Sequence, residues 1–202
     1  MKTKVMMSAV IVLLNGYSFS QNCKNLKVNK KDEFTGEQIK MSKTRIYKKG
    51  GLEEGFFQID KVAATFKLTF IYINSSVGIL NGGNFGCQGG DKLLIMFDDN
   101  SVLKLNLNGP FYGCRTESAG LGTKMLLGSY ATFATSNKVL FEPEYHITLS
   151  DLDLLMDKKI IKIRIEATGT KAVTHQKLNN LDLIIAEEDA SQFQKDVICI
   201  LN

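Results

Sequence analysis

Apolar and polar residues alternate with a period of two through much of the middle of this chain, a pattern typical of half-buried β-strands. The strongest segment covers residues 64–73 and is rich in aromatic and β-branched side chains. One face of this segment is apolar throughout and comprises Phe66, Leu68, Phe70 and Tyr72. We therefore expect a strand here that packs this face against a core.

Residues 92–97 and 102–107 are two further apolar segments, separated by four polar residues of the types that favour turns. The pattern predicts a β-hairpin. With the two central polar residues forming the turn, Phe97 lies opposite Val102. The first strand is apolar on both faces and should lie centrally, whereas the second alternates and should be half-exposed.

Helical patterns appear in the last third of the chain. A short helix is expected near 150–158, with Ser150 as its N-cap and Asp153 in the capping-box position. Alternating isoleucines predict a strand at 160–166, and a closing helix near 187–198 begins with acidic residues, as the helix dipole favours.

These elements predict an α+β fold, a mainly antiparallel β-sheet with a short helix near 150–158 and a C-terminal helix near 187–198. We expect one sheet to contain the strands at 64–73, 92–97, 102–107 and 160–166, with the helices packed on it. The chain has 202 residues, of which 44% are hydrophobic and 23% charged, so it can bury a substantial core. A single domain covering residues 21–202 is expected.

The first twenty residues have the features of a secretory signal peptide. Lys2 and Lys4 precede a mostly apolar segment at 5–14, and Ser18-Phe19-Ser20 supplies a small-x-small cleavage site. An apolar segment of this length is too short to span a bilayer. We expect residues 1–20 to be removed and the mature protein to be secreted or periplasmic, with no membrane span after signal removal.

Four cysteines, Cys23, Cys87, Cys114 and Cys199, all lie in the predicted mature chain, and an even number in an exported protein indicates disulfides. The hairpin register brings Cys87 near Cys114, while the other two lie near the ends of the mature chain, which often meet at a domain surface. We therefore expect Cys87 to pair with Cys114 and Cys23 with Cys199. Free buried thiols are the alternative, and the spacing does not favour a metal site.

A glycine-rich loop at 81–90 precedes the hairpin and contains Asn84 and Phe85. A Cys87–Cys114 disulfide would hold this loop against Phe111 and Tyr112. This rim is the candidate binding surface. The alternative, which we favour, is that the glycines serve only a backbone with positive φ near a disulfide.

Known catalytic motifs are absent from the sequence, among them G-x-S-x-G, H-E-x-x-H and the dinucleotide fingerprint. His146 lies close to carboxylates and could act as a base, but isolated histidines such as His146 and His175 are more often structural. The acid pairs Asp98-Asp99 and Glu187-Glu188 lie where a turn and a helix start already favour carboxylates. We expect no catalytic residue, no cofactor and no metal.

The formal net charge of +4 includes Lys2 and Lys4, so the mature chain is only weakly basic and a nucleic-acid partner is not expected. Residues 21–50 are locally basic, with nine Lys and Arg against three acids. A solvated strand face explains this segment better than an anion-binding patch does.

The segment LSDLDLLMDKKIIKIRIEAT at 149–168 and the pattern G-C-x-x-G-D-K-L-x-I-x-F-x-D at 86–99 resemble a set of uncharacterised small exported proteins of gram-negative bacteria. No activity is assigned to that set. The resemblance therefore implies export and a compact fold, and it transfers no catalytic residue.

Three functions fit these observations. The leading hypothesis is an exported non-enzymatic module that binds a protein partner or acts in the cell envelope. The first alternative is a hydrolase of envelope or extracellular polymers, which would require carboxylates or His146 to converge in one cleft. The second is a carrier of small apolar ligands, which would require the inward strand positions to leave a cavity.

Export is directly testable. N-terminal sequencing of the secreted or periplasmic product should begin at Gln21, because cleavage is expected after Ser20. A mature product that still contains Lys2 would contradict the signal peptide.

Overall fold

The computed structural model describes residues 23–75, 92–109, 115–118, 122–126, 129–133, 137–166 and 180–202. The predicted signal peptide at 1–20 lies outside these ranges. The strands are β1 Leu26–Lys31, β2 Gln38–Lys49, β3 Glu53–Val62, β4 Thr65–Asn74, β5 Lys92–Phe97, β6 Val102–Asn106, β7 Arg115–Ser118, β8 Gly122–Leu126, β9 Ser129–Phe133, β10 Asn137–Phe141, β11 Glu144–Ile147, β12 Ile160–Glu166 and β13 Leu181–Ile184; the helices are α1 Leu149–Asp157 and α2 Glu187–Leu201. The structure is thus mainly antiparallel β-sheet with two helices, and the predicted α+β class is confirmed.

The first sheet has the order β1-β2-β3-β4-β10-β7, and β11 also pairs with β4. β10 and β11 lie along β4 in one unbroken register, because Phe141 is opposite Tyr72 and Glu144 is opposite Thr69. Pro143 separates the two strands, since it has no N–H to donate, although its carbonyl still accepts from the Phe70 N–H at 3.1 Å. Residues 137–147 therefore act as a single interrupted strand.

The second sheet has the order β13-β12-β5-β6. The end of β6 reaches the first sheet, where Leu107 forms a bridge with Tyr145 and the Asn108 N–H donates to the Glu144 carbonyl at 2.7 Å. The expectation of one sheet is therefore wrong for β4, which lies in the first sheet while β5, β6 and β12 form the second. The β6–β11 contact connects the two sheets around a shared interior.

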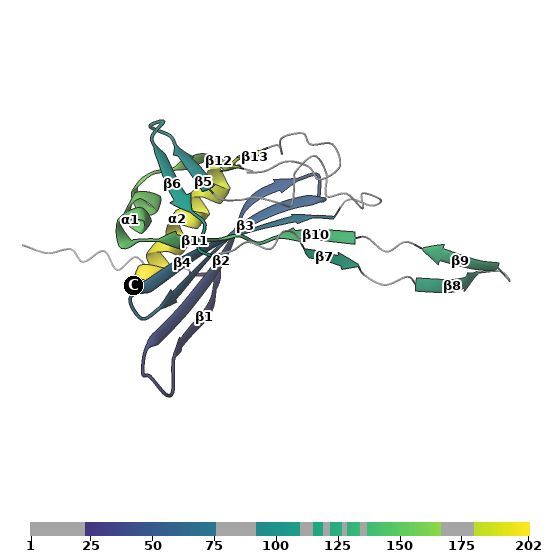
Figure 1. The fold of residues 1–202 in the computed structure, drawn as a ribbon, viewed down its shortest axis with the longest axis horizontal. Helices are drawn as coiled ribbons and strands as arrows, with labels where there is room; N and C mark the ends of the chain where they lie inside the picture. The colour runs from purple at the N-terminus through teal and green to yellow at the C-terminus, as the bar shows by residue number, and fades with distance from the viewer. Residues whose placement is uncertain are drawn as a thin grey trace, which may run out of the picture.

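Helix α2 fills that interior. Figure 1 shows it between the strands of the first sheet and those of the second, with α1 alongside, and it contacts β2, β3, β12 and α1. The Phe193 ring lies 5.1 Å from that of Phe57 on β3. The buried apolar residues form one cluster that draws on both sheets and both helices; it includes Phe57, Leu68, Phe70, Leu93, Ile95, Leu152, Ile163, Leu183, Phe193 and Val197. Each sheet thus has an inner face toward α2 and an outer face away from it.

The β5–β6 hairpin is confirmed, but its register differs by one residue from the prediction. Met96, not Phe97, lies opposite Val102, because the loop has three residues. The Asn100 N–H donates to the Phe97 carbonyl, and Asn100 adopts a φ of 64°, the left-handed conformation that closes such loops. This register places Leu93 opposite Leu105, so that the apolar residues of both strands face the core together.

Helix α1 begins slightly earlier than predicted. Its N-cap is Thr148, whose side chain accepts from the Asp151 N–H at 3.2 Å while the Asp151 carboxylate accepts from the Thr148 N–H at 2.9 Å. The capping box therefore lies two residues earlier than the predicted pair Ser150 and Asp153. Leu152 and Leu155 are the residues of α1 that are buried in the core.

Strands β7, β10 and β11 are not among the strands that the sequence pattern predicted. β7 is polar throughout and β10 ends in three consecutive apolar residues, whereas β11 alternates but is only four residues long. No helix within the described ranges is long and apolar enough to cross a membrane.

The interior position of α2 leads to a stability prediction. Phe193→Ala should lower the free energy of unfolding by about 3 to 5 kcal/mol, because it leaves a cavity between α2 and β3. Urea denaturation followed by circular dichroism measures the change. The control Ile184→Ala removes a side chain that is 78% exposed and should change stability by less than about 0.5 kcal/mol. Similar losses in both variants would contradict the packing.

Candidate functional site

The predicted rim of Asn84, Phe85, Phe111 and Tyr112 lies outside the described residues, as do Cys87, Cys114 and His175. That disulfide and that surface therefore stay predictions. The second predicted disulfide is confirmed: Cys23 and Cys199 are bonded, with their Cα atoms 5.9 Å apart. It joins residues 176 positions apart and connects the start of the described chain to the last turn of α2.

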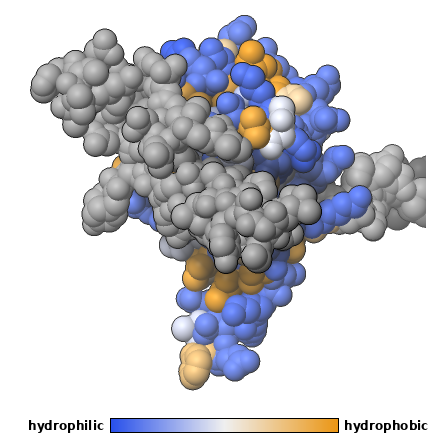
Figure 2. Space-filling view, turned by 90° about the vertical axis from the view of Figure 1, so that its right-hand side faces the viewer, coloured by the Kyte–Doolittle hydropathy of each residue, from blue (hydrophilic) through white to orange (hydrophobic). Residues whose placement is uncertain are grey.

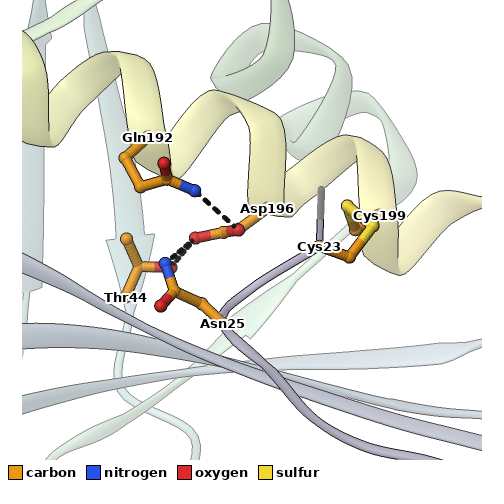
Figure 3. Close-up of a disulfide and its surroundings, with 6 residues drawn as sticks. All are labelled: Cys23, Asn25, Thr44, Gln192, Asp196 and Cys199. Atoms are coloured by element: carbon orange, nitrogen blue, oxygen red, sulfur yellow. Dashed lines mark hydrogen bonds between the residues drawn. A yellow bond between two sulfur atoms is a disulfide. The ribbon is translucent and has the colours of Figure 1, made fainter. Parts of the chain in front are cut away.

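A buried carboxylate lies one helical turn before this disulfide. Asp196 is only 1% exposed, and its oxygens accept from the side chains of Asn25, Thr44 and Gln192. Figure 3 shows Asn25 and Thr44 pointing toward Asp196 from the N-terminal segment and from β2. With three donors on one carboxylate, the cluster is satisfied internally and ties α2 to β2 and to the chain before β1.

Sequence reasoning missed Asp196, although a signal was present. It lies three residues after Phe193 and just before Val197, among the core positions of α2. A charged residue on the apolar face of a helix requires partners, because an unpaired buried charge is strongly destabilising. The sequence does not indicate that those partners are Asn25 and Thr44.

The outer face of the first sheet contains a groove of about 660 Å³. Two rows of cross-strand neighbours form its floor. One row runs across five strands through Val28, Met41, Asp60, Lys67 and His146. The next row runs through Lys30, Ile39, Val62 and Thr65. Lys40, Phe66 and Asn108 complete the lining of what we call the outer-face groove.

The apolar part of this groove lies mainly on β1 and β2 and at the end of β3. Val28, Ile39 and Met41 are half-buried, and Val62 is exposed. Figure 2 shows apolar surface between hydrophilic residues on the part of the molecule that narrows toward the β1–β2 hairpin. Apolar surface next to charged side chains is typical of a binding face, and less so of a solvated strand face.

Three lysines line the groove, and the carboxylates beside them are Asp60 and Glu144, so the cations outnumber the acids by one. Lys67 lies between two carboxylates, 2.9 Å from Glu144 and 3.4 Å from Asp60. The hydrogen bond from Lys67 to Glu144 is the main cause that raises the pKa of this lysine. These groups are partly exposed, so the ion pairs orient side chains more than they stabilise the fold.

Lys40 is the most buried of the three lysines, at 8% exposed. Burial, together with the charge of Lys61 directly opposite on β3, lowers its pKa. Lys61 donates to the carbonyls of Ile200 and Leu201 at the C-terminal end of α2, where cations are favourable. Lys61 thus places positive charge where the last turn of α2 has no basic residue of its own. The buried Lys40 alternates with the outward-facing Ile39 and Met41 of β2.

His146 lies on the outer face, next to Lys67 in the cross-strand register. It is exposed, and no carboxylate of the described residues lies within ion-pair distance of its imidazole. A general base normally needs a group that orients it, and here the nearby acids Asp60 and Glu144 are paired with Lys67 instead. The arrangement therefore lacks the geometry of an acid–base pair.

One member of each acid pair considered from the sequence, Asp98-Asp99 and Glu187-Glu188, forms an ion pair with a lysine. Asp99 forms an ion pair with Lys158 at 2.7 Å, and this bond is the main cause that lowers the pKa of Asp99. Glu187 pairs with Lys159. Within the described ranges, no group of three or more His, Cys, Asp or Glu could hold a metal ion.

The Asp196 cluster provides a matched pair of variants on the inner face of β2. Thr44→Val keeps the shape but removes one donor to Asp196, and should lower the free energy of unfolding by about 1.5 to 3 kcal/mol. Ser42→Ala should change it by less than about 0.5 kcal/mol, because the buried Ser42 hydroxyl has no hydrogen-bond partner among the described residues. Urea denaturation of both variants measures the difference. Equal effects would contradict the role assigned to the cluster.

No family model matches the chain, and neither a curated protein nor a solved structure does. The resemblance to small exported proteins of gram-negative bacteria therefore stays an expectation. The interpretation of the site comes from the contacts within the structure.

Proposed function

We propose that this chain is an exported, non-enzymatic module that binds a protein partner in the outer-face groove. The observation that carries the proposal is the composition of the groove, in which apolar side chains of β1 and β2 lie beside an excess of lysines. The Cys23–Cys199 disulfide supports export, because such bonds persist in oxidising compartments.

The chemistry of the groove suggests the kind of segment that it binds. Met41 and Ile39 offer contacts for an apolar side chain, while Lys30 and Lys67 lie in the same two rows. A polypeptide with an aromatic or aliphatic residue flanked by acids would match both features. Because the lysines are partly exposed, their charge should contribute mainly to association rate and specificity.

The two alternatives have weaker support. A hydrolase is favoured by the convergence of His146, Lys67 and Asp60 on one face, but Lys67 pairs with the acids that would have to orient the histidine. A carrier would need space between the sheets, and there Phe193 and Val197 of α2 are fully buried against their neighbours.

A selection experiment tests the binding function. A phage-displayed peptide library selected on the mature protein should yield segments with an aromatic or aliphatic residue flanked by Asp or Glu. Met41→Glu places a negative charge on the groove floor and should weaken binding of these peptides by at least about 30-fold, as expected for a hot-spot residue.

Met96→Glu is the matched control, since Met96 is also a half-buried methionine, on the outer face of the second sheet. It should leave the peptide affinity unchanged. Peptides that bind both variants equally, or a selection dominated by basic peptides, would contradict the proposal. Turnover in a hydrolase screen that is lost in His146→Gln would favour the enzyme instead.

A further inference from the structure

The tip of the β1–β2 hairpin, residues 32–37, presents an aromatic side chain to solvent. Phe34 is 98% exposed. The turn that carries it is held by local hydrogen bonds: Asp32 Oδ1 accepts from the N–H groups of Phe34 at 2.9 Å and Thr35 at 2.7 Å. The Gly36 N–H donates to the Asp32 carbonyl at 2.9 Å, and Gly36 has a φ of 73°. Phe34 is therefore presented by a defined turn.

The tip is also acidic. Asp32, Glu33 and Glu37 surround Phe34, and no lysine or arginine lies between residues 32 and 37. A single exposed apolar residue is common on protein surfaces and requires no explanation. What distinguishes Phe34 is its combination with three acids at the end of a projecting hairpin, which Figure 1 shows extending beyond the rest of the first sheet.

This composition complements that of the outer-face groove. The tip offers one aromatic residue and three negative charges, while the groove offers apolar side chains and three lysines against the two carboxylates Asp60 and Glu144. The tip cannot be occupying the groove of its own chain, because Phe34 is almost fully exposed. Yet the two lie next to each other in the fold, since Lys30 and Ile39 of the groove are close neighbours of the tip in the same hairpin.

We propose that two copies of this chain associate by reciprocal insertion, with Phe34 of each copy in the outer-face groove of the other. The inference rests on the proposed function, since it names the partner of that groove. The tip and part of the groove lie on the same hairpin. A two-fold axis between two copies could therefore place each tip in the groove of the other copy, which is the self-complementary geometry of most protein dimers. Phe34 would be the central anchor, and Glu33 and Glu37 would approach the partner's lysines.

Sedimentation equilibrium of the mature full chain tests the association. The wild type should form a dimer, and Phe34→Ser should raise the dissociation constant by at least about 30-fold, because it removes the anchor residue. Leu52→Ser is the matched control, since Leu52 is 51% exposed in the β2–β3 turn at the other end of the sheet. It should leave the dissociation constant unchanged.

A mixing experiment separates loss of contact from loss of fold. Phe34→Ser keeps an intact groove and Met41→Glu keeps an intact tip, so the two variants should be monomeric alone and form a heterodimer through one tip-in-groove contact when mixed. Native mass spectrometry detects this species, because the variants differ in mass. Absence of the heterodimer would overturn the proposal.

A wild type that is monomeric up to about 1 mM would also overturn it. If selected peptides then still bind in a Met41-dependent manner, only the self-association fails. If neither occurs, the binding function of the groove fails as well.

Discussion

The packing of α2 between the two sheets is the constraint on which the rest of this structure depends. Neither sheet alone buries its inner face, and among the described strands β6 and β11 connect the two sheets through a short backbone contact. Phe193 and Val197 of α2 supply the apolar surface that both sheets share. Because the interior is filled in this way, the outer faces and the projecting hairpin are what the described residues offer to a partner.

Two different interactions hold α2 against the N-terminal part of the chain. The Cys23–Cys199 disulfide is covalent, and the Asp196 cluster adds hydrogen bonds one turn earlier on the helix. A buried carboxylate is favourable only when its donors are all in place, so this cluster makes the position of β1 and β2 relative to α2 specific. The cluster thereby also helps to fix the position of the groove, because the apolar residues of the groove belong largely to these two strands.

The groove illustrates how cross-strand register creates a site from residues that are dispersed in sequence. Val28, Met41, Asp60, Lys67 and His146 belong to five strands and become neighbours only through antiparallel pairing. Lys67 is shared between the two carboxylates Asp60 and Glu144, so the remaining positive charge of the groove comes from Lys30 and Lys40. Because Lys67 pairs with both of these acids, neither is left to orient His146 as a catalytic base.

Local pattern alone was sufficient for the α+β class, for the strands β4, β5, β6 and β12, and for both helices, because side-chain periodicity and capping residues act over a few positions. It also identified Cys23 and Cys199 as partners. The β5–β6 register, the division into two sheets and the partners of Asp196 depended on tertiary structure. A loop of three residues instead of two shifts every pair, and Asn25 and Thr44 meet Asp196 across more than 150 residues. Such contacts are chosen by the packing of α2, which no local pattern encodes.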